Sequence, residues 1–446
     1  MTIMAFSGVR SWLALATVIL TVMVAMTPLH AGPALPDSPA DRQALAARLL
    51  EAIERRADFR TGLVRSFGGD DSATGRYGAQ LYDTGLRLLA DSRHATALIT
   101  TFAAANAGEG RPESPQTLAA GYSPPTGIFS WIRIAGFSRP QWWNDWEWSV
   151  KTGENAWLGL GALHHFTQTG EPQALQLARD RAQFILALQD DDGGFRIGPR
   201  GLADDFWWHR KSTENNESAV AFLDRLAAVT GEGSYRAAAD RAFAWLAGKM
   251  YDRDHHLFRR GEVEAAGGWH RDSVDDLAAD TVNWLPLARI LGDRRFGADR
   301  QARLAEIGRM VDAMVERCGV RQDGVLRGIS YSPLSRRQAV ISPEWSAQYV
   351  LLCRRLAREH QRDRDRIGAG VWLGRGEEIL RSIACYVTVR EGEPVAAHAV
   401  FPDGAVAAGQ PMWDDIILTP AASLSTASHL YLAFALQGID PLRAAD

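Results

Sequence analysis

The segment KSTENNESAVAFLDRLAAV, residues 211–229, places a cluster of polar side chains directly before an apolar helical pattern. Ser212 or Thr213 is a natural N-cap, because its hydroxyl oxygen can accept from the free N–H groups of the first helical turn. Glu214 and Glu217 stand three residues apart and therefore share one face of that turn. Two interpretations are open: the acids match the helix dipole, or they form a carboxylate site in a cleft.

Helical patterns and connections alternate on both sides of this segment. Helices are predicted at residues 41–56, 81–90, 93–105, 155–167, 172–188, 214–229, 235–250, 277–291, 299–317, 343–360, 371–389 and 424–436, without a convincing strand pattern. Short turns alternate with connections of roughly twenty to fifty residues, so all long connections fall at one end of the helices. This arrangement predicts an all-α (α/α)6 toroid of six helical hairpins, with long loops on one rim.

The two rings of the toroid follow from the order of the helices. Inner helices are expected to start near residues 81, 155, 214, 280, 344 and 424, and the helix at 41–56 to close the ring against the last one. Gly170, Gly231 and Gly292 stand just past predicted helix ends, where a left-handed C-cap favours glycine. We therefore predict one toroid domain at residues 41–446, preceded by a linker at 32–40.

Four motifs, taken in their order along the chain, resemble the six-hairpin glycosidase superfamily, and more narrowly its exported bacterial members of unassigned activity. They are GENAWLGL at 153–160, STENN at 212–216, PEWSAQ at 343–348, and the end of the chain from STAS at 425–428 to ALQGIDPL at 435–442. The superfamily includes inverting glycosidases, unsaturated-uronyl hydrolases and sugar epimerases, with polysaccharide lyases on related toroids. The resemblance therefore implies a carbohydrate cleft, and not one particular reaction.

Composition and the N-terminus indicate an exported globular protein. The chain has 446 residues, 46% of them hydrophobic, and a net charge of -4, which argues against nucleic acid as a partner. Arg10, an apolar run at 12–26 and Ala31 are typical of a signal peptide at residues 1–31. The run is short for a membrane span, so we expect a periplasmic or secreted protein without stable membrane insertion after cleavage. Because Leu29 is not small, an uncleaved anchor is the alternative.

No cofactor or metal site is predicted. The acidic turn at 190–192 lacks the ligand spacing of a calcium loop and is interpreted as a solvated turn. The odd number of cysteines excludes full internal pairing, and their apolar helical surroundings favour buried free thiols, with one disulfide left open: Cys318, Cys353 and Cys385.

Glycoside hydrolysis needs a proton donor and a second carboxylate on the other side of the scissile bond. Glu214 is the first choice for the acid, because it stands in the most polar helix start beside aromatic residues that could raise its pKa by desolvation. Asp280 is the first choice for the base, with Asp83 and Glu344 behind it. Capping explains one acid at each helix start equally well.

Aromatic and amide side chains gather at the same helix starts and in the long connections. Indole rings suit the C–H faces of sugars, although core packing is the better explanation of any single tryptophan. The candidates for binding a carbohydrate substrate are Tyr82, Trp143, Asp145, Trp146, Glu154, Asn155, Trp157, Trp208, Asn215, Glu217, Trp284, Trp345, Gln348 and His429.

Two other functions remain open beside hydrolysis. A polysaccharide lyase on the same toroid would need a base beside cations that neutralise a uronate, for which Tyr82, Tyr331, Arg327 and His209 are available. A non-catalytic glycan-binding protein would keep the aromatic residues and not depend on the acids.

Overall fold

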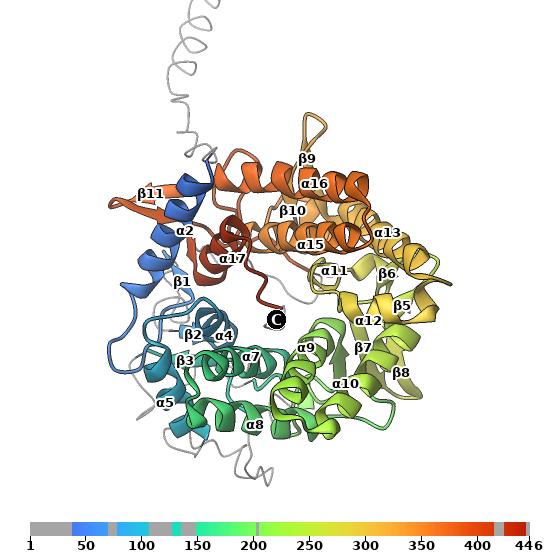
Figure 1. The fold of residues 1–446 in the computed structure, drawn as a ribbon. Helices are drawn as coiled ribbons and strands as arrows, with labels where there is room; N and C mark the ends of the chain where they lie inside the picture. Colours follow the sequence, from blue (N-terminus) through green and yellow to red (C-terminus); the bar gives the residue numbers. More distant parts are fainter. Residues whose placement is uncertain are drawn as a thin grey trace, which may run out of the picture.

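The computed structural model describes residues 38–69, 78–106, 127–134, 149–201, 205–413 and 423–442, and its helices form two concentric rings (Figure 1). Each inner helix packs on the next, and the last packs on the first, so that the ring is closed. The (α/α)6 toroid predicted from the sequence is therefore confirmed. Its inner helices are α4 (Leu81–Leu89), α7 (Thr152–Thr169), α9 (Thr213–Thr230), α11 (Asp280–Asn283) with α12 (Leu287–Gly292), α15 (Pro343–Arg362) and α17 (Thr426–Gln437).

The outer ring covers the inner one. Each outer helix packs against an inner helix that adjoins it in the chain, except that α2 packs against α17 at the other end of the chain, as predicted. Arg42 of α2 also donates to Glu377 of α16 at 2.9 Å. The outer helices are α2 (Pro39–Glu54), α5 (Ala95–Asn106), α8 (Pro172–Leu186), α10 (Gly233–Trp245), α13 (Arg300–Cys318) and α16 (Arg366–Ala384).

Serine caps begin three inner helices, and glycine ends three. The hydroxyls of Ser212, Ser342 and Ser425 each accept from the backbone N–H three residues on, at 3.1–3.3 Å. At the other end Gly170, Gly231 and Gly438 adopt left-handed C-caps with φ of 72°, 74° and 76°. The prediction for Gly292 is wrong, since it is the last residue of α12 and the C-cap is Asp293, whose backbone is extended.

The fourth inner helix is broken where the sequence predicts one helix at 277–291. Pro286 cannot donate to the helix ladder and clashes with the preceding turn, so α11 ends at Asn283 and α12 starts at Leu287. The last outer helix is also shifted from the predicted 371–389. Asp365 caps it earlier, at the N–H of Gly368, and it ends at Ala384.

Small antiparallel sheets occupy the connections, contrary to the prediction of no strands. The sheet β4–β7–β8 pairs Lys211 with Glu262, and Glu262 with Arg271. The strands are β1 (Phe67–Gly68), β2 (Gly78–Gln80), β3 (Trp131–Arg133), β4 (Arg210–Ser212), β5 (Tyr251–Asp252), β6 (Leu257–Phe258), β7 (Gly261–Ala265), β8 (Gly268–Arg271), β9 (Gly319–Gln322), β10 (Val325–Ile329), β11 (Thr388–Arg390), β12 (Glu393–Val395) and β13 (Leu424–Ser425). Four short helical segments complete the described elements: η2 (Leu246–Met250), η3 (Val274–Asp276), η4 (Arg294–Phe296) and α14 (Pro333–Arg337).

Glycines allow the inner helices to approach one another closely. A Cβ on Gly85 would lie 2.5 Å from the backbone carbonyl of Trp157, and one on Gly159 would lie 2.4 Å from the Phe222 ring. Real Cβ atoms do not tolerate such contacts, so α4, α7 and α9 are spaced for glycine at these positions.

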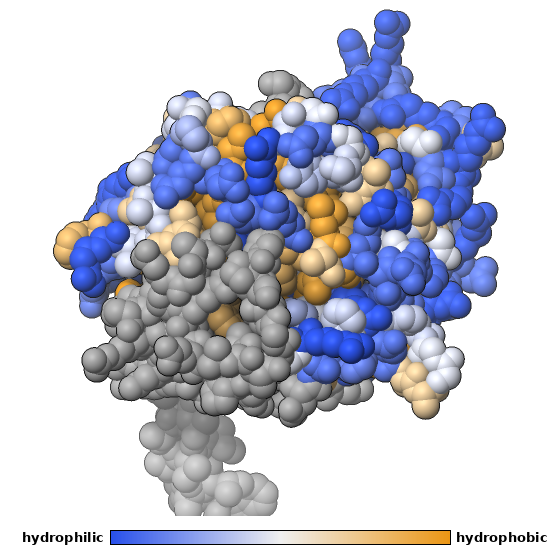
Figure 2. Space-filling view, turned by 90° about the horizontal axis from the view of Figure 1, so that it is seen from below, coloured by the Kyte–Doolittle hydropathy of each residue, from blue (hydrophilic) through white to orange (hydrophobic). Residues whose placement is uncertain are grey.

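The core lies between the two rings, and hydrophilic residues cover most of the described surface in Figure 2. All three cysteines are free; Cys318 and Cys353 are buried as expected, whereas Cys385 is exposed. No helix within the described ranges is both long and apolar enough to cross a membrane. The predicted signal peptide lies outside the described residues.

Candidate active site

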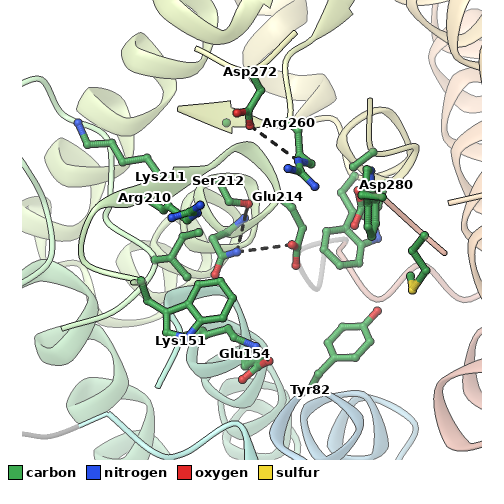
Figure 3. A pocket seen from close by; sticks show the side chains of 18 of the residues that line it. Tyr82, Lys151, Glu154, Arg210, Lys211, Ser212, Glu214, Arg260, Asp272 and Asp280 are labelled. Atoms are coloured by element: carbon green, nitrogen blue, oxygen red, sulfur yellow. Dashed lines mark hydrogen bonds and ion pairs between the residues drawn. The ribbon is translucent and has the colours of Figure 1, made fainter. Parts of the chain in front are cut away.

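A pocket of about 510 Å³ opens where the inner helices begin (Figure 3). It is lined by the first turns of α4, α7, α9, α11 and α15 and by residues of the long connections. The sequence placed these helix starts at one end of the toroid, and the structure brings many of their side chains together. The predicted residues that line the pocket are Tyr82, Glu154, Trp157, Glu214, Asn215, Asp280, Trp284, Glu344 and Trp345.

Glu214 extends into this pocket from the first turn of α9 (Figure 3). The neighbouring Asn215 holds the helix start in place, since its Oδ1 accepts from the N–H of Gly153 at 2.6 Å. Burial, together with the charge of Glu154, raises the pKa of Glu214 to about 7, and Lys151 opposes the shift. Glu214 is therefore present in both protonation states near neutral pH.

Asp280 lines the pocket from α11 and is only 4% exposed. Its Oδ1 has no hydrogen-bond partner among the described residues. Burial and the charges of Glu214 and Glu344 raise the pKa of Asp280 well above its usual value. Both effects favour the protonated form of Asp280 over the ionised form.

Glu344 belongs to the first turn of α15 and is held by two donors. The Tyr82 hydroxyl donates to its Oε1 at 2.9 Å, and the Gln348 amide donates to the same oxygen at 3.1 Å. Burial and the nearby Asp83 raise the pKa of Glu344 to about 8, although both hydrogen bonds lower it. Gln348 does not line the pocket and acts on it through Glu344.

Glu154 differs from the other acids because it has a cation partner. The Lys151 ammonium lies 3.3 Å from its Oε1, on the preceding turn of the chain. The other oxygen, Oε2, is buried without a partner among the described residues. The pocket therefore combines one acid that has a cation partner with acids that form no ion pair within the described residues.

An aromatic wall faces these acids. The Tyr82 and Trp157 rings meet edge to face at 5.3 Å, and Trp284 lies 5.1 Å from Trp157. On the other side Trp345 lies 6.0 Å from Trp413. Aromatic faces next to hydrogen-bonding acids suit a sugar ring, which has both apolar C–H faces and hydroxyls.

Several predicted site residues lie elsewhere. Asp83 is buried and does not line the pocket; burial raises its pKa to about 7. Asn155 binds the backbone of Ile128, from which its Oδ1 accepts at 2.9 Å and to which its Nδ2 donates at 3.0 Å. The ring of Trp208 packs under Arg196, at 4.2 Å.

His429 and Glu217 also lie outside the pocket. His429 is buried, and its Nδ1 donates to the Ser425 carbonyl at 2.7 Å. Burial lowers its pKa to about 4, which keeps the ring neutral. Glu217 lines a second cavity, described below. Trp143, Asp145 and Trp146 fall outside the described residues.

The cations of the pocket were missed by the sequence analysis. Lys151 and Arg210 line it, and so do Arg260 and Asp272 (Figure 3). Arg260 lies 2.9 Å from Asp276 and 3.8 Å from Asp272. Arg260 and Asp272 flank the hairpin β7–β8. In the sequence this hairpin corresponds to two short runs separated by glycines 267 and 268.

The carboxylates of the acidic turn at 190–192 form ion pairs with lysine side chains. The Lys211 ammonium is buried and lies 2.7 Å from Asp192, 3.1 Å from Asp190 and 3.3 Å from Glu262. This network fixes the strand that leads into α9. Within the described ranges no group of three or more histidine, cysteine or acidic side chains is arranged to hold a metal ion.

Comparisons with known proteins identify the fold. No family model and no curated protein matches the chain. Among solved structures, a sugar epimerase from a ruminal bacterium matches with a TM-score of 0.60 and 12% identity, over 90% of this chain and 99% of that one. The α-1,6-mannanase GH76A from Salegentibacter sp. HEL1_6 matches with a TM-score of 0.54 and 13% identity, over 90% and 100%. An unsaturated glucuronyl hydrolase specific for heparin matches with a TM-score of 0.56 and 12% identity, over 90% and 96%.

These neighbours have different activities and share one architecture. The chain therefore shares the fold of these proteins, the (α/α)6 toroid that the sequence predicted. At this level of identity the likeness establishes the fold alone, and the reaction has to be inferred from the pocket.

Proposed function

We propose that the protein is a glycoside hydrolase that acts on an oligo- or polysaccharide. The observation that carries this proposal is a pocket in which an aromatic wall is combined with a carboxyl group at the start of each of four inner helices: Glu154, Glu214, Asp280 and Glu344. Their environments differ, since one is paired with a cation and the others are shifted toward the protonated form. Glycoside hydrolysis needs that difference, because one group must give a proton while another takes one.

Glu214 is assigned the acid role. With its pKa raised to about 7, a large share of Glu214 holds a proton near neutral pH, and that form can transfer the proton to the leaving glycosidic oxygen as the C–O bond breaks. The base must be ionised to take a proton from the attacking water. Glu154, which has the Lys151 ammonium 3.3 Å from its Oε1, is a better candidate than Asp280, which the sequence analysis favoured and whose pKa burial raises. The superfamily resemblance implies that this water attacks with inversion.

The mannanase neighbour suggests one substrate class to test. Its inactive variant, in which two consecutive aspartates are replaced by asparagines, was solved with α-1,6-mannotriose. In this chain the starts of α7 and α9 each have one acid followed by asparagine, Glu154-Asn155 and Glu214-Asn215. Both asparagines bind backbone groups, so Glu154 and Glu214 are single acids on two different helices. This arrangement differs from the two consecutive aspartates of the mannanase. We choose an oligomannoside as the first substrate to test because the fold is shared.

The lyase alternative is weaker on these observations. Of its candidate residues only Tyr82 lines the pocket, and its hydroxyl donates to Glu344. Burial and that carboxylate raise the pKa of Tyr82 well above its usual value, which makes it a poor base. The Tyr331 hydroxyl donates to the His398 carbonyl at 2.9 Å, while Arg327 and His209 do not line the pocket.

A digest of a glycan panel by the purified protein tests the proposal. The panel should contain α-1,6-linked mannooligosaccharides and uronate-containing oligosaccharides, with products read by mass. Hydrolysis adds one water to the summed fragments, whereas a lyase gives an unsaturated fragment without water. Unchanged mass for a glycan that binds, measured by calorimetry, would instead favour the non-catalytic binding protein.

A further inference from the structure

A second cavity, which we call the rear pocket, lies on the other side of Trp284 from the candidate active site. It has a volume of about 420 Å³ and lies between α9, α12 and α15, where Asp440 and Leu442 also line it. Trp284 lines both cavities. Arginine dominates the rear pocket, with six arginines against four acids: Arg225, Arg236, Arg289, Arg355, Arg358 and Arg362.

Most of these charges neutralise one another. Asp224 is 2.6 Å from Arg289, and Glu359 is 2.6 Å from Arg362. Asp440 is 3.3 Å from Arg358. Three of the four acids are therefore already paired, and they leave cationic groups in excess.

Arg225 is the arginine whose charge is not matched. It is only 6% exposed, and among the described residues its one polar contact is from Nη2 to Nδ1 of His164, at 3.4 Å. No carboxylate of the described residues forms an ion pair with it. A guanidinium has five N–H donors, so most of those of Arg225, which lines the rear pocket, have no acceptor among the described residues. A buried cation in this state is costly unless something anionic binds it.

Glu217 adds a further unused group. It is 1% exposed, and neither of its oxygens has a partner among the described residues. Burial and the charges of Asp280 and Glu214 raise its pKa well above the usual value, which favours its protonated form. Arg355, in contrast, is engaged, because its Nε lies 3.7 Å from Asp440 Oδ2 and its Nη1 donates to the Leu285 carbonyl at 3.2 Å.

We propose that the rear pocket is a binding site for a small oxyanion, a phosphate or carboxylate group, held by Arg225 within the arginine-rich lining. Planar guanidinium groups form paired hydrogen bonds with such anions, and an ammonium or sugar hydroxyl would not satisfy the unmatched charge. The volume admits an anion attached to a sugar-sized body. This site is independent of the proposed hydrolase activity.

Calorimetric titration tests the proposal. Inorganic phosphate and glucuronate are titrated separately into the parent protein at constant ionic strength, so that the two arms distinguish a phosphate from a sugar carboxylate. We expect saturable binding of at least one anion, weakened about tenfold or more in Arg225→Gln, since hydrogen bonds to charged groups are worth that much. Arg179→Gln is the control. Arg179 is half-exposed on α8 and pairs with Glu232 outside both cavities, so this variant should bind like the parent.

A second variant covers the case in which Arg225→Gln does not fold. Arg236 and Arg362 stand at the rim of the rear pocket with side chains 53% and 63% exposed, so replacing both by glutamine should leave the fold intact. We expect anion binding to weaken several-fold in this double variant. The proposal is overturned if neither anion binds the parent saturably, or if the arginine variants of the rear pocket bind with the affinity of the parent.

Discussion

Glu214 and Glu217 belong to one helical turn, yet they face different cavities. Glu214 lines the candidate active site, whereas Glu217 lines the rear pocket behind Trp284. The sequence analysis placed both on one face and could not separate them. At the residue scale their roles depend on which charges surround each carboxyl, and those charges come from other parts of the chain.

The surroundings of Glu214 predict the pH profile of the hydrolase. Because its pKa is raised to about 7, kcat/KM on any identified glycan should fall on the alkaline side as Glu214 loses its proton near pH 7. Lys151 lowers that pKa, so Lys151→Met should move the alkaline limb of the profile to higher pH. An alkaline limb that stays where it is in the variant would contradict the assignment of Glu214.

The buried acids also predict how stability depends on pH. The pKa of Glu344 is raised to about 8 in the folded chain and is ordinary in the unfolded chain. A group with a raised pKa contributes stability that is present below the unfolded pKa and is lost as pH rises through the folded one. Asp280 and Glu217 shift in the same direction. The melting temperature should therefore fall from about pH 5 to about pH 8.

Glu344→Gln isolates part of this effect, because glutamine keeps an oxygen that accepts from Tyr82 and cannot ionise. The decrease in melting temperature between about pH 5 and about pH 8 should be smaller in the variant than in the parent. Equal decreases in both proteins would show that Glu344 is not shifted as described.

At the scale of single elements, the sequence predicted the helices and missed what interrupts them. The helix beginning at Ser212 was predictable from its cap and its apolar run. The sequence contains Pro286, but the apolar pattern on either side of it led to the prediction of one continuous helix. The strands β7 and β8 are short runs without a regular alternation of polar and apolar residues. They pair across glycines in a segment that the sequence analysis treated as one of the long connections. The sequence analysis therefore assigned no helix or strand at Arg210 and Arg260, and it did not place these cations in the site.

Close packing between α4 and α7 gives a prediction for this scale. The Cβ of Gly85→Ala would meet the Trp157 backbone, which cannot move as a side chain can, so the variant should lose about 1–3 kcal/mol of unfolding free energy. Gly370→Ala is the matched control. Gly370 is exposed in α16 with no atom near the added Cβ, so alanine should stabilise the helix by about 0.5–1 kcal/mol. Urea unfolding measures both, and two changes of the same sign would contradict the packing.

At the scale of the whole molecule, the toroid was predictable because short and long connections alternate. That alternation places every inner helix start on one rim, and for this reason Tyr82, Glu154 and Glu344 meet although they are far apart in the chain. It does not determine which polar side chains point inward. Asn155 and His429 stand at helix starts and bind backbone groups, which such positions need as much as substrates do.

Export is a proposal that concerns the whole chain. We expect the mature protein to begin near Gly32 and to be found outside the cytoplasm, because residues 1–31 have the charge and apolar run of a signal peptide. N-terminal sequencing of the protein from fractionated cells measures this. A cytoplasmic protein that keeps its initiator end would contradict the proposal, and a membrane-bound one would support the uncleaved anchor.

The central claim is that the carboxyl groups of the pocket hydrolyse a glycosidic bond, with Glu214 as the proton donor. Its most direct test is the mass of products formed in heavy-oxygen water from a glycan that the parent protein cleaves, compared with the same digest by Glu214→Gln. The parent should incorporate one heavy oxygen for each bond broken. The variant, which cannot give the proton, should do so on the order of a hundredfold more slowly, while Glu232→Gln, an acid at a helix start outside the pocket, retains the parent rate. Products without heavy oxygen, or an unchanged rate in Glu214→Gln, would contradict the account.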